Sequence, residues 1–138
     1  MRIWIVIGAL NAFVAVALGA FAAHGLRGSV SEADLAIFQT GAHYHIVHAL
    51  ALVAVGLLAG YVASWRTTAA GVLFFAGSIL FSGSLYYLGI SGSRALVLVT
   101  PLGGLAFLLG WLMVALAALG LRPAGARRDQ AAASSSSP

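Results

Sequence analysis

The sequence has 138 residues, of which 62% are hydrophobic and only 7% are charged, and its formal net charge at pH 7 is +4. Soluble domains carry about 25% charged residues, so a chain this apolar cannot cover its own surface in water, and the composition indicates a one-domain integral membrane protein. The basic residues are a few arginines at predicted helix ends and in the tail rather than a patch, which argues against nucleic acid as a partner. The lack of cysteine excludes disulfides and thiolate metal sites.

Four apolar segments follow one another along the chain, at residues 3–23, 43–64, 68–90 and 96–121. Each is close to the ~20 residues that a membrane-spanning helix needs, and none contains Asp, Glu, Lys or Arg. Helices are expected because lipid leaves irregular backbone without hydrogen-bond partners. The predicted fold class is therefore all-α, an integral membrane bundle of four transmembrane helices over residues 1–121, followed by a disordered cytoplasmic tail over residues 122–138.

The first apolar segment carries small residues on one face. They recur in steps of four, three and four, at Gly8, Ala12, Ala15 and Gly19. Small residues let membrane helices approach closely, so this face either packs inside the bundle or mediates dimer contacts. Asn11 lies on the same face near the middle of the segment, and we expect its amide to hydrogen-bond across helices.

A polar link joins the first two apolar segments. His24-Gly25 predicts the end of the first helix, with Gly25 as a left-handed cap, and Ser31-x-x-Asp34 resembles a capping box that opens a new helix. Residues 32–40 either lie amphipathically in the membrane interface or continue directly into the second helix. The predicted architecture keeps them as a short amphipathic segment between the first two helices.

The arginines predict the orientation of the bundle. With four spans, both termini and the middle link share one side of the membrane, and that side carries Arg2, Arg66, Arg122, Arg127 and Arg128. The opposite side carries Arg27 and Arg94, beside Glu32 and Asp34. The positive-inside rule then places both termini in the cytoplasm, so we expect a multi-pass protein of the cell inner membrane with its histidine-bearing link outside.

The fourth apolar segment contains a helix-start signal of its own. Thr is a common N-cap and Pro suits the first turn of a helix. Thr100-Pro101 therefore predicts that the main span begins at Pro101, after an irregular approach at residues 96–99.

The four histidines all lie around the link and the start of the second apolar segment. His45 and His48 are three residues apart, so they share a helix face, while His43 points to the opposite side. His24 can approach the pair if the first two helices pack antiparallel. Three imidazoles at one depth can bind zinc or copper, and two from different helices can ligate haem. Alternatively, these residues serve in proton relay or transport, or as interhelix hydrogen-bonding groups.

No nucleotide-binding loop, nucleophile elbow or paired catalytic carboxylates occur in the sequence. Their absence favours a non-enzymatic structural, assembly or accessory role in the lipid bilayer, as a homo-oligomer or a subunit of a larger membrane complex. The alternatives are a transporter or channel component that works as an oligomer through Asn11, Ser82 and the histidines, and a metal- or haem-binding protein that uses His24, His45 and His48.

Several motifs in order resemble a known family, the domain of unknown function family 423. They are GAFAAHGL at 19–26, FQT at 38–40, YHIVHALAL at 44–52, FSGSLY at 81–86, TPLGG at 100–104 and Gly110-Trp111. The resemblance covers about residues 3 to 120 and implies a small four-span protein of bacterial inner membranes. It implies no particular activity, because the family has no settled biochemical function.

The resemblance also marks individual positions. The family-motif positions are His24, Tyr44, His48, Ser82, Tyr86 and Pro101. Two residues depart from the family pattern: Ala22 stands where Gly is usual, and His45 stands where many bacterial members carry Gln. Because Gln does not replace a histidine metal ligand, this favours hydrogen bonding at position 45. The candidate functional cluster is His24, Tyr44, His45, His48 and Tyr86, with Asn11, Ser82 and Pro101 as packing or polar-interface residues.

Overall fold

The computed structural model describes residues 1–121, and these form an all-helical bundle with four helices long and apolar enough to cross a membrane. The elements are α1 (Arg2–Phe21), η1 (Ala22–Leu26), α2 (Glu32–Leu58), α3 (Trp65–Gly77), η2 (Ser78–Ser82), α4 (Gly83–Ser91) and α5 (Val99–Ala118). η1 and η2 are single π-helical turns, so α1–η1 and α3–η2–α4 are each one continuous span. The predicted fold class is confirmed, and the predicted tail lies outside the described residues.

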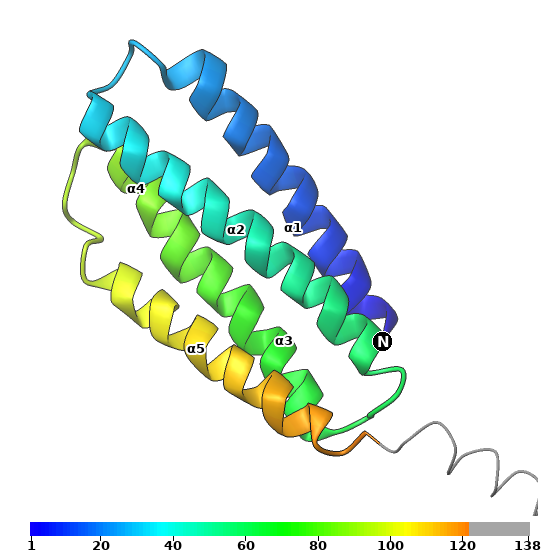
Figure 1. Ribbon diagram of the computed structural model, residues 1–138. Coiled ribbons are helices and arrows are strands. Elements are labelled where there is room, and N and C mark those ends of the chain that lie inside the picture. The colour runs from blue at the N-terminus through cyan, green and yellow to red at the C-terminus, as the bar shows by residue number, and fades with distance from the viewer. Residues whose placement is uncertain (122–138) are drawn as a thin grey trace, which may run out of the picture.

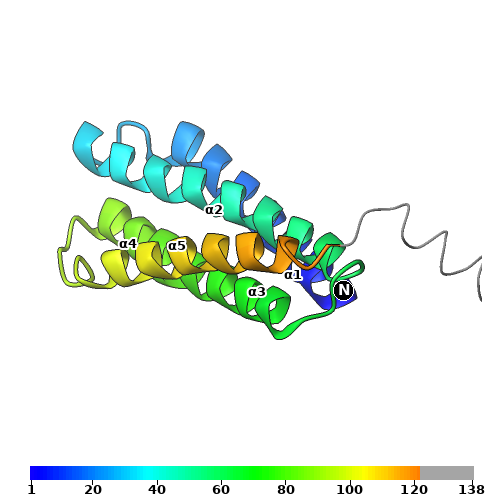
Figure 2. The ribbon, with the colours of Figure 1, turned by 60° about the horizontal axis from the view of Figure 1, so that its bottom comes forward.

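The helices pack in the order α1, α2, α3–α4 and α5, so that α1 and α5 form the two flanks of the bundle (Figure 1). α1 packs along α2, and α5 packs along α3 and η2. Figure 2 shows the same order from a second direction. The N-terminus and the end of α5 lie at the same end of the bundle, as four crossings require.

Close backbone approaches hold neighbouring helices together at glycines. A Cβ on Gly8 would lie 2.8 Å from the backbone nitrogen of Val53, and one on Gly56 would lie 2.9 Å from that of Ile5. Gly8 and Ala15 of the predicted small-residue face are therefore packed inside the chain, which is the first of the two arrangements that the sequence left open, whereas a Cβ at Gly19 would meet nothing within 4 Å. Packing of this kind drives helix association in lipid, where apolar contact alone gives no preference.

The start of α2 corrects one prediction. The expected separate amphipathic segment does not exist, because residues 32–40 are the first turns of α2, which runs unbroken to Leu58. The cap itself is confirmed: the Ser31 hydroxyl accepts a hydrogen bond from the Asp34 amide at 3.1 Å and donates one to the Asp34 carboxylate. Leu35 and Phe38 are buried, so this stretch is held by the bundle.

The end of the first span was also predicted wrongly. The helix continues past Gly25 as the π-helical turn η1, and the left-handed glycine is Gly28, with a φ of 82°. Gly25 has a different role, because a Cβ there would lie 2.6 Å from the ring of Phe21. It makes room for an aromatic side chain rather than ending the helix.

The fourth span begins at Val99 rather than at Pro101. Leu98 precedes the helix and provides no side-chain cap, so Thr100 is not the N-cap that the sequence suggested. Its hydroxyl instead hydrogen-bonds to that of Ser84 at 2.8 Å and joins α5 to α4. Pro101 does lie in the first turn, where its missing N–H has no intrahelical acceptor to lose.

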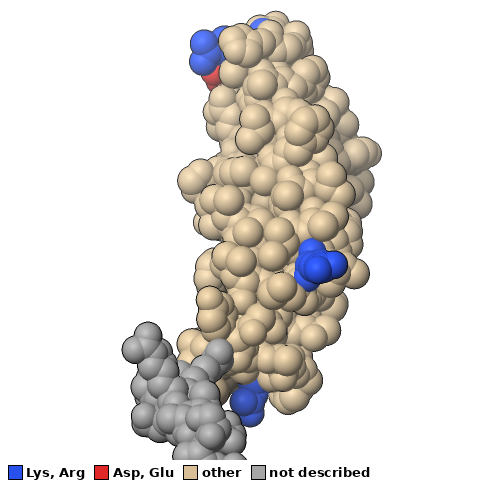
Figure 3. Space-filling view, turned by 90° about the vertical axis from the view of Figure 1, so that its right-hand side faces the viewer, with Lys and Arg blue, Asp and Glu red and all other residues tan. Residues whose placement is uncertain are grey.

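Two clusters of buried apolar residues form the core: a smaller one where η1 meets the start of α2, with Ala22, Leu26, Leu35 and Phe38, and a larger one around the middle of the bundle. The buried members of the larger cluster are Ala51, Leu52, Val55, Ala70, Phe74 and Phe107. The outside of the bundle is mostly apolar as well, with exposed leucines, valines and phenylalanines along α1 and α5. The face drawn in Figure 3 carries few charged side chains, and an acidic one is visible only near one end, beside basic ones. This surface requires a lipid surrounding.

Candidate functional site

His45 and His48 are the buried histidines of the bundle, with 7% and 4% of their surfaces exposed. Both lie on α2, which packs between α1 and the α3–α4 span. Helical spacing puts them on one face, as predicted, but their partners come from different helices. They therefore form two separate sites rather than one cluster.

His45 connects three helices through its ring. Its Nε2 lies 3.0 Å from the side-chain oxygen of Asn11 on α1, and its Nδ1 lies 3.1 Å from the hydroxyl of Tyr86 on α4. The Asn11 amide nitrogen donates to the Ile7 carbonyl at 2.8 Å, which fixes the amide so that its oxygen faces the histidine. His45 Nε2 must then carry a hydrogen, and the neutral ring accepts at Nδ1 from Tyr86.

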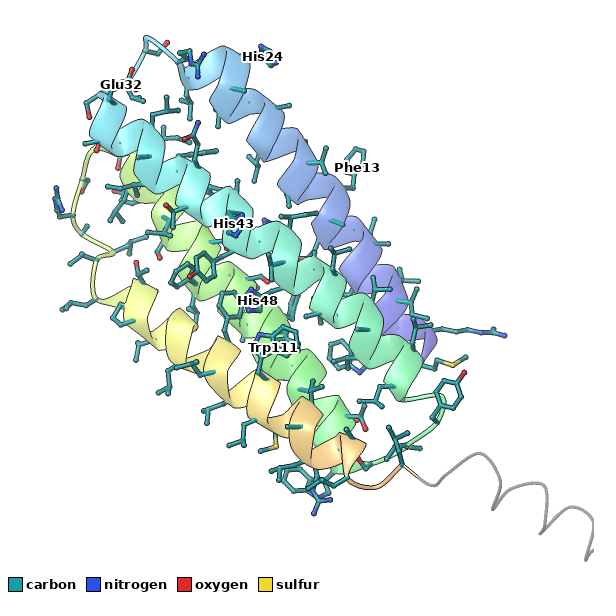
Figure 4. The ribbon with its side chains drawn as sticks, viewed as in Figure 1. Phe13, His24, Glu32, His43, His48 and Trp111 are labelled. Carbon is teal, nitrogen blue, oxygen red and sulfur yellow. The ribbon has the colours of Figure 1, made fainter. Side chains whose placement is uncertain are left out.

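His48 has the opposite tautomer. Its Nδ1 lies 2.8 Å from the backbone carbonyl of Tyr44, which can only accept, so Nδ1 carries the hydrogen. Its Nε2 accepts the indole N–H of Trp111 on α5 at 3.2 Å. Figure 4 shows His48 and Trp111 facing each other from α2 and α5. A protonated His48 ring would place one N–H against another, so this geometry requires the neutral form.

Aromatic rings enclose His48 on several sides. The Phe107 ring stacks on it with centroids 3.4 Å apart and planes within 8°, and Phe74 and Trp111 lie at its edges. The Tyr44 ring is also nearly parallel to the imidazole, with the two ring centroids 6.1 Å apart. The imidazole is thus the polar centre of an aromatic cluster that joins α2 to α3 and α5.

The structure does not bring His24 to these two residues. His24 lies on η1 at the far end of the first span and is exposed, and Figure 4 shows it pointing away from the bundle. His43 is exposed on the outer side of α2, as predicted. Within residues 1–121, no group of three His, Cys, Asp or Glu side chains could hold a metal ion. The proposed ligand set of His24, His45 and His48 is therefore not assembled.

The other predicted site residues lie in three different surroundings. Tyr86 hydrogen-bonds to His45 and packs its ring 4.6 Å from that of Phe38. Tyr44 and Pro101 are exposed and line a groove between α2 and α5. Ser82, in the π-helical turn η2, is fully buried, and its hydroxyl has no hydrogen-bond partner within the described part of the chain.

Two residues of the His48 site were not among the predicted site residues. Phe107 reads as one more apolar residue of the last segment, so nothing in the sequence distinguishes it. Trp111 did carry a signal, because an indole N–H inside a membrane helix needs an acceptor. Inside a membrane bundle such acceptors are limited to polar side chains and to backbone carbonyls that no helical hydrogen bond uses. The His48 side chain is such an acceptor.

Comparison with known proteins places this chain among small membrane proteins. The profile of a family described as a protein of unknown function, DUF423, matches residues 18–104. The chain belongs to this family. A DUF423 relative, the UPF0382 membrane protein YwdK of Bacillus subtilis, is 47% identical over 120 residues, which cover 86% of this chain and 98% of that protein.

Two staphylococcal relatives are similar over the same range. UPF0382 membrane proteins of Staphylococcus epidermidis and Staphylococcus aureus are 43% and 44% identical, covering 86% and 85% of this chain and 97% and 95% of their own lengths. No solved structure matches the chain. The DUF423 protein is thus a multi-span membrane protein in contact with the lipid bilayer, in agreement with its four candidate spans.

Chemically, the two sites are hydrogen-bond connectors. All four ring nitrogens of His45 and His48 are engaged inside the chain. A metal would need an unshared electron pair on a ring nitrogen, and these pairs face the Tyr86 hydroxyl and the Trp111 indole. A Gln amide also offers one donor and one acceptor, so the same hydrogen bonds are open to Gln at position 45.

Proposed function

We propose that this DUF423 protein has a non-enzymatic structural, assembly or accessory role in the bacterial inner membrane. One observation carries the proposal: both ring nitrogens of each buried imidazole are engaged in hydrogen bonds within the bundle. Groups that act on a substrate keep a donor, an acceptor or an electron pair available for it. Here the two buried histidines instead connect α1, α2, α4 and α5.

The geometry gives less support to transport by this chain. A conducting path needs polar groups in succession along the membrane normal. The bonds of Asn11, His45 and Tyr86 join three helices side by side at one depth. A transporter would therefore need further copies or partners to supply the rest of the path.

Gentle purification tests the accessory role. The chain carries a tag without histidine, is expressed from its own locus, cross-linked in the membrane and purified in native lipid discs. We expect a membrane protein partner at fixed stoichiometry, equally abundant with His45→Gln. Turnover of a substrate, or solute flux in proteoliposomes by the purified chain, would contradict the proposal.

We further propose that both termini face the cytoplasm, because in the sequence five arginines flank the four spans on the side of the termini, against two, Arg27 and Arg94, on the other side. The chain has no cysteine, so single cysteines give a clean test. Ser29→Cys should react with an impermeant maleimide in intact cells, and Ala63→Cys should react only after permeabilisation. The reverse pattern would invert the topology.

A further inference from the structure

A groove of about 620 Å³ lies between α2 and α5, beside His48. It exists because α5 packs on α3 and η2 and makes few contacts with α2. The groove surface is largely apolar and aromatic, and includes Tyr44, His48, Phe81, Pro101, Gly104 and Trp111. In a membrane, a groove of this kind must be filled by something apolar.

The length of the groove limits what can fill it. Along α5 its lining runs from Pro101 to Trp111, about 15 Å at 1.5 Å per residue. This is half of the ~30 Å hydrocarbon core, so the groove spans one leaflet. A helix from a second copy or another protein would cross both leaflets, so only half of that helix would fit in the groove. A single lipid chain from one leaflet matches all of it.

The polar groups of the groove point to the same kind of occupant. His48 and Trp111 satisfy each other at the deep end, so no donor or acceptor is left free there. Tyr44 lies one helical turn before His48, with its ring 4.9 Å from Phe81, and its hydroxyl makes no hydrogen bond within residues 1–121. The groove therefore suits a hydrocarbon chain, and it offers no polar group at its deep end that a polar occupant could bind.

We propose that this groove binds one acyl chain of a membrane phospholipid, from the leaflet at the end of the bundle where α4 connects to α5. The chain lies along α5 from Pro101 to Trp111 and passes the ring of Tyr44, which lines the groove. This inference is independent of the proposed accessory role, since a bound lipid is compatible with any function of the bundle.

Photolabelling tests the proposal on the full chain. The protein is reconstituted into phosphatidylethanolamine–phosphatidylglycerol vesicles that contain phosphatidylglycerol with a mid-chain diazirine, and adducts are mapped by mass spectrometry. We expect them to concentrate on Val47 and Leu108, which line the groove. The reference positions are Leu10 and Phe13 on α1, which are 61% and 75% exposed, against 40% and 69% for Val47 and Leu108.

Gly104→Leu fills the groove, and the fold should tolerate it because a Cβ at Gly104 meets no atom closer than 3.7 Å. It should lower groove labelling several-fold. Gly19→Leu is the matched control, since a Cβ there meets nothing within 4 Å and Gly19 lies on α1 outside the groove.

Labelling no higher in the groove than at Leu10 and Phe13 would overturn the proposal. So would labelling unchanged by Gly104→Leu in a protein with normal thermal unfolding, or chain-to-chain cross-links at Val47 and Leu108 that exclude the lipid. The last result would assign the groove to a second copy. Co-purification of an isoprenoid quinone in place of phospholipid would likewise reject the acyl chain.

Discussion

The sites of His45 and His48 lie one helical turn apart on α2, yet they hold the bundle together in different ways. His45 is held by polar side chains, with Asn11 on α1 and Tyr86 on α4 at its two nitrogens. His48 is held by rings, stacked on Phe107 with its Nε2 facing the Trp111 indole. The first site needs only a donor and an acceptor, whereas the second also needs a flat ring.

The difference shows that two residues of the same type, His45 and His48, have different roles in the bundle. Two histidines in i,i+3 spacing suggest a shared ligand, but here they point their nitrogens at different helices and carry opposite tautomers. A side chain that offers one donor and one acceptor should replace His45. Replacement of His48 also removes the stacked surface and leaves the Trp111 N–H without an acceptor in a nonpolar surrounding, so it should cost more.

The largest effect is expected from His48→Ala. The change leaves a cavity beside Phe107 and an unpaired indole N–H, and together these should lower the free energy of unfolding by about 3 kcal/mol. Reversible unfolding in mixed detergent micelles measures it. His43→Ala, an exposed site on the same helix, serves as the control and should change little. Equal losses at both positions would remove the distinction between a buried connector and a surface histidine.

A smaller loss is expected where α5 meets η2. A Cβ at Gly103 would overlap the backbone nitrogen of Phe81, whereas one at Gly104 meets only the Phe81 ring, at ordinary contact distance. Gly103→Ala should cost about 2 kcal/mol by overpacking, and Gly104→Ala less than about 0.5 kcal/mol. The same unfolding assay compares them. If Gly103→Ala were neutral, α5 would not be packed as closely as the His48 site requires.

The smallest effects distinguish the two histidines most sharply. His45→Leu keeps a side chain of similar bulk but loses both hydrogen bonds, which should cost about 1 kcal/mol. His45→Gln should be nearly neutral, because its amide can donate to Asn11 and accept from Tyr86. His48→Gln should remain clearly destabilising, since it cannot stack on Phe107. Identical responses of the two sites to Gln would argue against separate roles.

Much of the fold follows from the sequence, because charge-free segments of about 20 residues have only one stable form in lipid. The Ser31–Asp34 cap and the interhelix role of Asn11 could be predicted for similar local reasons. The helix boundaries were less predictable. Gly25 reads as a stop signal, but it packs under Phe21, and Thr100 reads as a cap, but it bonds to Ser84.

The candidate site was predicted only in part. Helical spacing places His45 and His48 on one face, but it does not tell which neighbouring helix each nitrogen meets. That depends on the packing order of α1, α4 and α5 around α2, which no local pattern contains. The continuation of the first span through η1 to Leu26, followed by a turn at Gly28, leaves His24 at the rim, and the expected three-histidine cluster is lost for this reason.

The central claim is that His45 and His48 are neutral connectors of opposite tautomer. Solid-state NMR on the chain labelled with ¹⁵N-histidine in lipid bilayers tests this directly, with His45→Gln used to assign the signals. The structure predicts a hydrogen on Nε2 of His45 and on Nδ1 of His48. Two rings of the same tautomer, a doubly protonated ring at His48, or signals shifted by a bound metal would contradict it.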